Sequence, residues 1–189
     1  MSIPRSAIQR EKKIYMLTMT GLMAAITSVL APLALPVGPV PVTLVNLVIY
    51  LSLYLLGGRL ASISCLVYIL LGLAGMPVFA GFTGGMGKLL SPTGGYILGY
   101  LLMVVVSGSF TDRFSSRILH AMGMIIGTAL CYGLGTVWYC ISTQTTPAAA
   151  LALCVFPFIP GDVVKIGAAL TLGPVLRDRL EKAGLLQKN

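Results

Sequence analysis

The strongest constraint on this chain is a series of apolar runs that fill most of its 189 residues. Apolar and aromatic residues make up 57% of the chain and charged residues only 10%, whereas soluble domains carry about 25% charged residues. A membrane-spanning helix needs about 20 apolar residues. We therefore predict an all-α integral membrane protein that forms one domain, residues 1–189. Its six transmembrane helices are expected at about 14–31, 43–57, 60–74, 94–110, 118–140 and 161–176.

The second and third runs are short, but together they are too long for one span, so we expect a tight turn at Gly57-Gly58-Arg59. Eleven of the 13 Lys and Arg residues fall at this turn, at 111–117, before the first run or after the last. Because positive residues concentrate in cytoplasmic connections, we predict a multi-pass protein of the cytoplasmic membrane with both termini inside. The charge is spread along the chain, which argues against a nucleic-acid partner.

The connections on the opposite side are long and rich in Gly and Pro. APLALPVGPVPVT holds four prolines, and GMPVFAGFTGGMGKLLSPTGGY holds seven glycines. Irregular backbone at membrane depth is tolerated only where it is buried in protein or lines a cavity. We therefore expect an outward-facing pocket capped by the loops between helices 1 and 2, 3 and 4, and 5 and 6. Flexible linkers are the alternative, but linkers are typically polar. Lys88, the only basic residue in these loops, is expected to extend to the membrane interface.

One ionisable pair, Asp162 and Lys165, lies at the start of the last apolar run. Pro157 and Pro160 interrupt the chain before it, so we expect a short interfacial helix at about 148–156 and then the last helix. Residues three apart share one face of a helix. Ionisable side chains inside a membrane usually mark substrate or ion pathways, which favours a ligand site over a pair that only locks two helices together.

Motifs for catalysis or metal binding do not emerge from the sequence. GFTGGMGKL departs from a phosphate-binding loop, because five residues separate Gly81 from Gly87 and Leu89 follows Lys88 where Ser or Thr is needed. The single histidine, His120, has no partner histidine, and the four cysteines lack metal-type spacing. We therefore predict no enzyme activity, no catalytic residue, no metal and no cofactor. A partner or an ion gradient would have to supply energy for transport.

Three stretches carry a resemblance to a known family: PVPVTLVNL (39–47), GMPVFAGFTGGMGKLLSPTGGYILGY (75–100) and PFIPGDVVKIGAAL (157–170). In order and spacing they resemble the BioY family, the biotin-binding S components of energy-coupling factor (ECF) transporters. The resemblance implies an S-component-like bundle that captures biotin with high affinity and releases it into the cytoplasm. It also implies a separate transmembrane coupling protein and ATPase subunits as partners.

In that family the PTGGY loop and the D-x-x-K of the last helix contribute to the pocket. Biotin offers a ureido ring with two N–H donors and a carbonyl acceptor, a thioether ring and a carboxylate tail. Asp162 can accept from the N–H groups, and Lys165 can donate to the carbonyl or the carboxylate, or hold Asp162 ionised. Aromatic rings can cover the ligand, and glycines admit close backbone approach. The expected substrate-binding residues are Asn46, Phe79, Gly84, Gly85, Thr93, Gly94, Gly95, Tyr96, Asp162 and Lys165.

Some of these residues have structural alternatives: a helix–helix hydrogen bond for Asn46, and core packing or interfacial anchoring for Phe79 and Tyr96. Two positions depart from the family's usual pattern. Val45 stands where members usually have Gln, and Ser91 where they usually have Gly. The change to Val45 removes a polar contact to an amide-like head group.

Small residues on the first helix offer a docking face for the partner that the resemblance implies. Thr20, Ala24 and Ser28 recur every four residues, and so do Gly21 and Ala25. Such spacing lets helices approach closely. We expect docking through Gly21, Ala24, Ala25 and Ser28, with packing inside this bundle as the alternative.

Three other functions remain open at the level of sequence. The first is a self-sufficient carrier for biotin or a related vitamin, without ATPase partners. The second is a membrane enzyme that uses Asp162 as a base, for which only Lys165 is available as a second group. The third is a structural bundle without a ligand.

Overall fold

The computed structural model describes residues 5–35 and 39–184, and its regular elements are helices. In the described residues, β pairing is limited to two isolated bridges, Leu35 with Val42 and Phe79 with Thr83. Residues 36–38 of the first predicted outer loop, and Lys188, lie outside the described part of the chain. The helices are α1 (Arg5–Leu30), α2 (Val45–Leu73), α3 (Met86–Leu90), α4 (Gly94–Arg113), α5 (Arg117–Thr143), α6 (Pro147–Cys154), the 3-10 turn Phe156–Phe158 and α7 (Ile159–Lys182).

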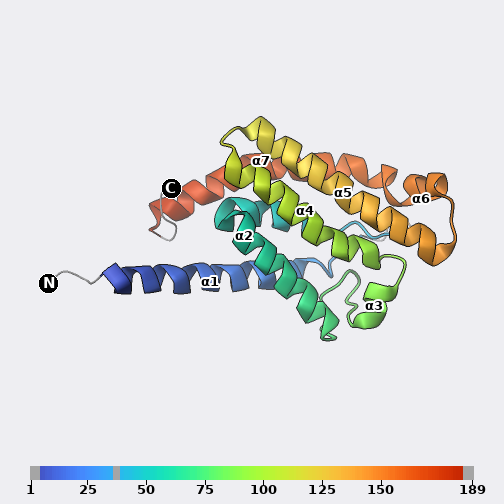
Figure 1. Ribbon diagram of the computed structural model, residues 1–189, viewed down its shortest axis with the longest axis horizontal. Helices are drawn as coiled ribbons and strands as arrows, with labels where there is room; N and C mark the ends of the chain where they lie inside the picture. The colour runs from blue at the N-terminus through green and yellow to red at the C-terminus, as the bar shows by residue number, and fades with distance from the viewer. Residues whose placement is uncertain (1–4, 36–38, 185–189) are drawn as a thin grey trace.

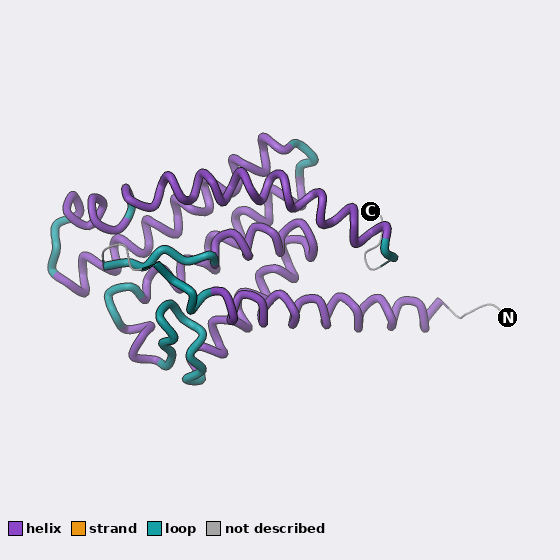
Figure 2. Tube along the Cα trace, turned by 180° about the vertical axis from the view of Figure 1, so that it is seen from behind, coloured by secondary structure: helices purple, strands orange, loops and turns teal. Residues whose placement is uncertain are grey.

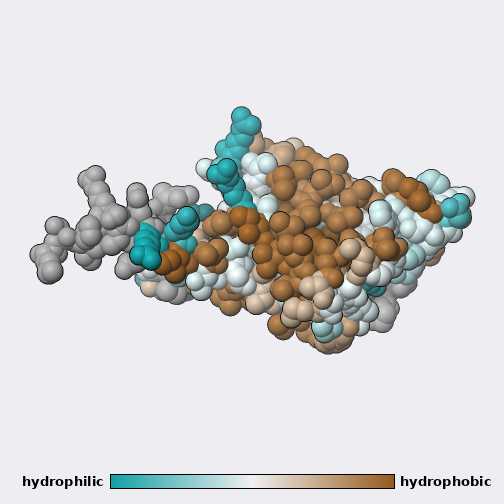
Figure 3. All heavy atoms as spheres, turned by 60° about the horizontal axis from the view of Figure 1, so that its bottom comes forward, coloured by the Kyte–Doolittle hydropathy of each residue, from teal (hydrophilic) through white to brown (hydrophobic). Residues whose placement is uncertain are grey.

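Most of these helices have the length and composition of membrane spans. Within the described residues, five stretches qualify: four lie in α1, α2, α4 and α5, and the fifth runs from α6 through α7. Figure 3 shows one face of the molecule as a broad hydrophobic surface with polar residues gathered toward its ends. The prediction of an all-α membrane protein is therefore confirmed.

The helix α2 is divided by a sharp bend at Gly57, whose φ of 76° and ψ of 167° are not helical. A positive φ is accessible to glycine at little cost. Beyond the bend, the N–H of Gly58 donates to both carboxylate oxygens of Asp112, at 2.9 and 3.1 Å. Such a bond satisfies one of the free N–H groups at the start of a helix. The two segments of α2 lie where the second and third spans were predicted.

The two segments of α2 approach α4 closely because glycines face each other at the crossing. A Cβ on Gly108 would lie 2.7 Å from the Cα of Gly58, and a Cβ on Gly58 would lie 2.9 Å from the Cα of Gly108. Small residues at such crossings let helix backbones pack tightly in membranes. This contact holds the bend of α2 against the last two turns of α4.

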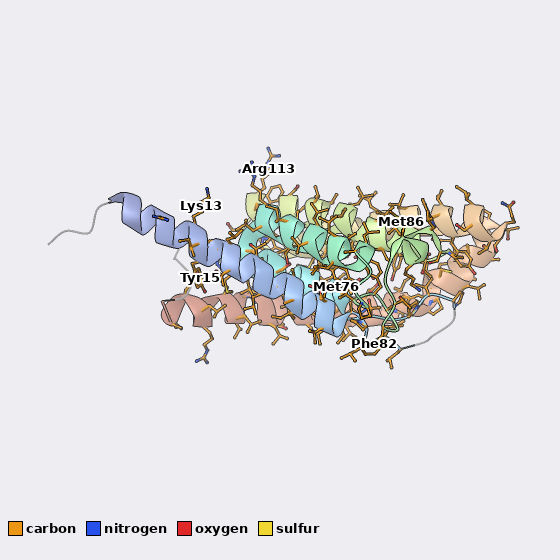
Figure 4. All side chains as sticks on the ribbon, turned by 90° about the horizontal axis from the view of Figure 1, so that it is seen from below. Lys13, Tyr15, Met76, Phe82, Met86 and Arg113 are labelled. Atoms are coloured by element: carbon orange, nitrogen blue, oxygen red, sulfur yellow. The ribbon has the colours of Figure 1, made fainter. Side chains whose placement is uncertain are left out.

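Both ends of the described chain lie at the same end of the bundle. Figures 1 and 2 place the start of α1, the end of α7, the bend of α2 and the short α4–α5 connection there, and they place α3, α6 and the longer loops at the opposite end. In Figure 4, Lys13 and Arg113 mark the first end, whereas Met76, Phe82 and Met86 mark the second. The structure thus groups the basic connections with the termini.

Helix bounds differ from the predicted ranges mainly at the polar ends. The helix α1 begins at Arg5, and α7 continues to Lys182, because apolar runs mark only the part of a helix that crosses the hydrocarbon. Pro160 lies within the first turn of α7, where the missing N–H costs nothing. The 3-10 turn at Phe156–Phe158 separates α6 from α7.

The Gly58–Gly108 contact generates a stability prediction. Gly108→Val adds a branched side chain against the α2 backbone, so we expect it to lower the free energy of unfolding by about 1–3 kcal/mol. Thermal unfolding in detergent measures the change. Gly167→Val is the matched control, because a Cβ at Gly167 meets no atom within 4 Å. Equal unfolding midpoints for the two variants would contradict the role of this crossing.

Candidate functional site

The centre of the site is the carboxylate of Asp162, in the first turn of α7. The Lys165 Nζ donates to Oδ1 at 3.1 Å, and the Asn46 Nδ2 donates to the same oxygen at 3.3 Å. The Tyr132 hydroxyl donates to Oδ2. The donors come from three helices, α7, α2 and α5, although Asn46 and Asp162 are 116 positions apart in the sequence. One carboxylate therefore joins the first segment of α2, the middle of α5 and the start of α7.

The ion pair at this point is removed from solvent. The side chain of Asp162 is 6% exposed and that of Lys165 is 11% exposed. A buried charge is costly unless it is paired and hydrogen-bonded, and here the carboxylate has three donors. A carboxylate offers about four acceptor positions, so roughly one remains for a ligand without breaking an existing bond.

Two small adjacent cavities lie at this end of the bundle. The first, of about 40 Å³, is lined by the Asp162 cluster together with Thr43, Thr128, Cys131, Phe158 and residues 40–42. The second, of about 30 Å³, is lined by Phe79, Lys88 and Thr93 among others. Both are also lined by Val40, Pro41, Thr43, Tyr96 and Tyr100. Residues from all three long loops, or from the helix ends beside them, therefore surround these two cavities.

Aromatic side chains form the walls between these cavities. The Tyr96 hydroxyl lies 3.3 Å from Thr136 Oγ1, and the Tyr100 hydroxyl lies 3.4 Å from Thr43 Oγ1. The ring of Phe79 is 1% exposed and packs edge-on against Tyr68, with ring centroids 5.7 Å apart. Phe79 and Tyr96 therefore combine core packing with a place in a cavity wall.

The predicted glycine contacts have a different origin. A Cβ at Gly84, Gly94 or Gly95 would collide with neighbouring protein atoms, and Gly85 has a φ of 84°. None of these four glycines lines either cavity, whereas Thr93 does. Gly84, Gly94 and Gly95 therefore permit close approach between parts of this protein, and Gly85 permits a positive φ. Contact of these glycines with a ligand stays a prediction.

Sequence reasoning missed several side chains at this location, most importantly Tyr132. Its neighbours on the same face of α5, Thr128 and Thr136, are four residues away on either side, and this polar stripe within an apolar run was the available signal. Lys88 was predicted to extend to the membrane interface, but it lines the second cavity. No sequence pattern singled out Tyr100, because one tyrosine in an apolar helix is typical of ordinary core packing.

The two positions that depart from the family pattern lie in different environments. Val45 is 1% exposed and lines the second cavity, so the replacement of Gln removes a polar group from its wall. Ser91 is held by its own loop, since its Oγ donates to the Lys88 carbonyl at 2.6 Å and its carbonyl accepts from Trp138 Nε1 at 3.0 Å. Ser91 therefore anchors the loop to α5.

The structure divides the small residues of α1 between two faces. Ala24 is 1% exposed and Thr20 is 3% exposed, so both face the bundle, and the prediction that Ala24 forms a docking surface is wrong. Ser28 is half-buried and donates to the Ala24 carbonyl at 2.8 Å. Gly21 and Ala25 are exposed. Residues four apart share a face, and only the Gly21–Ala25 face is accessible to a partner.

The Tyr132–Asp162 bond generates a second prediction. Tyr132→Phe removes one of the three donors from a buried carboxylate, so we expect it to lower the free energy of unfolding by about 1–3 kcal/mol. Thermal unfolding measures this loss. Tyr139→Phe, on the same helix, is the control, since the Tyr139 hydroxyl makes no hydrogen bond within the described residues. If both variants unfold at the same midpoint, the bond does not stabilise the site.

Comparison with known proteins agrees with this architecture. Residues 6–182 match the sequence model described as the BioY family. The chain is 38% identical over 154 residues to the "Biotin transporter BioY2" of Lactococcus lactis subsp. cremoris, which covers 81% of this chain and 85% of that protein. It is 35% identical over 164 residues to the "Probable biotin transporter BioY" of Pyrococcus horikoshii, with 87% and 94% covered. A crystal structure of the "S-component for biotin from an ECF-type ABC transporter" is similar with a TM-score of 0.80 and 26% identity, covering 96% of this chain and 95% of that one. The chain belongs to the BioY family.

Proposed function

We propose that this protein is the membrane-embedded biotin-binding subunit of an ECF-type transporter and mediates biotin uptake. Its relatives are named biotin transporters, and the similar solved structure is an S component for biotin. The observation that carries the proposal is the buried Asp162 carboxylate with donors from α2, α5 and α7, at the wall of a cavity. The names of the relatives and of the solved structure indicate binding and transport, so we assign no catalytic step to the chain.

Asp162 is the proposed acceptor for one ureido N–H group of biotin. Three of its roughly four acceptor positions are occupied by Asn46, Tyr132 and Lys165. The ureido N–H takes the free position, so no existing donor is displaced. Lys165 keeps its bond to Asp162 and donates a second N–H to the ureido carbonyl, because its ammonium group has three donors. Asn46, Tyr132 and Lys165 therefore stay paired, as burial demands.

The remaining lining suits the apolar part of biotin. Tyr96, Tyr100 and Phe79 offer ring faces and edges to the thioether ring, and Lys88 offers a positive charge for the carboxylate tail. The cavities of about 30 and 40 Å³ are much smaller than the roughly 300 Å³ or more of typical small-molecule sites. Binding therefore requires that the lining side chains move apart and merge the two volumes.

We place the protein in the cytoplasmic membrane with both termini inside. Lys13 and Arg113 lie at the end of the bundle that holds the termini (Figure 4). Arg59 follows the bend of α2 and Arg117 begins α5 at the same end, and the cytoplasmic side attracts such residues. The cavities, near α3 and the start of α7, then lie toward the outside. Biotin arriving from outside meets this end first.

The accessible face of α1 is the proposed contact with the coupling protein. Gly21 and Ala25 are exposed and four residues apart, between the exposed apolar residues Leu17, Leu22 and Val29. Small residues on an apolar face permit close helix approach. A self-sufficient carrier would need no such partner, and the similarity to an ECF S component does not favour that alternative.

Equilibrium binding of radiolabelled biotin to the detergent-purified chain tests the ligand site. We expect Asp162→Asn and Lys165→Met each to weaken binding at least about tenfold, which corresponds to about 1.4 kcal/mol, because each variant leaves a buried partner unpaired. Lys182→Met is the matched control, since its ion pair with Asp178 lies on the same helix but is exposed. Unchanged affinity in both site variants would refute the proposed role of this pair.

Co-purification of the coupling protein and ATPases from cells that express the whole transporter tests the docking face. We expect Ala25→Trp to abolish co-purification and biotin uptake while biotin binding by the purified chain stays at the wild-type level. Gly167→Trp is the control, because it places the same side chain on an exposed part of α7 with open space around it. Normal co-purification and uptake by Ala25→Trp would exclude this face.

A further inference from the structure

A large apolar groove lies on the outside of the bundle between α5, α6 and α7. Its volume is about 560 Å³, more than ten times that of either cavity at the Asp162 site. Figure 1 shows α6 at the end of the bundle where α5 ends and α7 begins. The lining residues are Ile125, Thr128, Ala129, Tyr132, Gly133, Thr136, Val137, Pro147, Leu151, Val155, Ile159, Asp162, Val163 and Ile166.

The groove is hollow because small residues lie between large ones along one face of α5. Ala129 and Gly133 form its floor, flanked by the exposed side chains of Ile125 and Val137. A Cβ at Gly133 would meet no atom within 4 Å. The hollow therefore reaches the helix backbone, and no side chain of the described residues fills it at Gly133.

The few polar groups in the lining already have partners. The Thr128 hydroxyl donates to the Met124 carbonyl at 2.7 Å, the Thr136 hydroxyl pairs with Tyr96, and the Tyr132 hydroxyl donates to Asp162. Among the described residues, no cationic side chain lines the groove, and its one charged residue, Asp162, is paired with Lys165. A ligand held here consequently gains mainly apolar contact.

The length of the groove matches the depth of one leaflet of a bilayer. From Ile125 to Val137, α5 rises about 18 Å at 1.5 Å per residue, slightly more than half of a hydrocarbon core about 30 Å thick. The helices on both sides have the composition of membrane spans. The groove runs along the middle of α5, from Ile125 to Val137, and α6 and the first turns of α7 line it as well.

We propose that this groove is a binding site for one acyl chain of a membrane phospholipid. A saturated hydrocarbon chain fits a long apolar hollow without leaving any polar group unpaired. The carboxylate tail of a ligand such as biotin would be buried there without a donor, which is costly. This inference does not depend on the identity of the transported ligand.

An acyl chain in this groove would also pack against the membrane-facing side of the Asp162 site. Thr128, Tyr132 and Asp162 line both the groove and the cavity of about 40 Å³. An acyl chain in the groove keeps water away from the Tyr132–Asp162 hydrogen bond on its membrane side. The lipid thus adds an apolar layer outside Thr128, Tyr132 and Asp162, the residues that separate the groove from the cavity.

Native mass spectrometry tests the proposal on the full chain reconstituted in phosphatidylglycerol vesicles and then transferred into a mild detergent. We expect the wild-type chain to retain a phospholipid, and Gly133→Trp, which fills the hollow, to lose it, with occupancy falling about tenfold or more. Val163→Trp fills the groove from the opposite wall and provides a second variant if the first one does not fold. Ile126→Trp is the matched control, because residue 126 is exposed on α5 but does not line the groove.

Retention of the phospholipid by both filling variants at the wild-type level would overturn the proposal. It would equally be overturned if the filling variants kept the phospholipid and lost biotin binding, because the groove would then hold the transported ligand. Loss of the phospholipid from the filling variants but not from Ile126→Trp, with biotin binding within about threefold of the wild type, is the supporting result.

Discussion

The hydrogen bonds to the buried carboxylate of Asp162 are the interactions on which one half of this structure depends, the half with α3, α6 and the longer loops. It accepts from Lys165 within its own helix, from Asn46 on α2 and from Tyr132 on α5. A charge in this environment must stay paired, because removing one partner of a buried ion pair typically costs about 3–5 kcal/mol. The same carboxylate that holds three helices together keeps about one acceptor position free.

The opposite half is held together by a different means. Glycines at the α2–α4 crossing bring backbones into contact at Gly58 and Gly108, and Asp112 satisfies the N–H group that the bend at Gly57 exposes. Backbone packing of this kind is short-ranged and apolar. The bundle thus joins a tightly packed end, which holds the termini, to an opposite end in which polar groups, small cavities and longer loops meet.

Two unequal volumes share the wall formed by Tyr132 and Asp162. On the side of this wall that faces the interior of the bundle, a small cavity is lined by charged and hydroxyl-bearing side chains. On the membrane side, a larger groove is apolar. The hydrogen bond between the two residues therefore lies between the small cavity and the apolar groove. The strength of such a bond rises when water is excluded.

Local sequence determined the apolar spans, the break before α7 and the pairing of Asp162 with Lys165, because helical period and proline act over a few residues. Only the tertiary structure decided that Tyr132 and Asn46 complete the carboxylate's partners, since the rotation of each helix is set by packing against segments far away in the chain. The same rotation turned Ala24 inward and Ala25 outward, although the sequence offers both as small residues. Only the tertiary structure shows that Gly84 and Gly94 lie against backbone atoms and Gly95 against the Trp138 side chain, whereas their contact with a ligand stays a prediction.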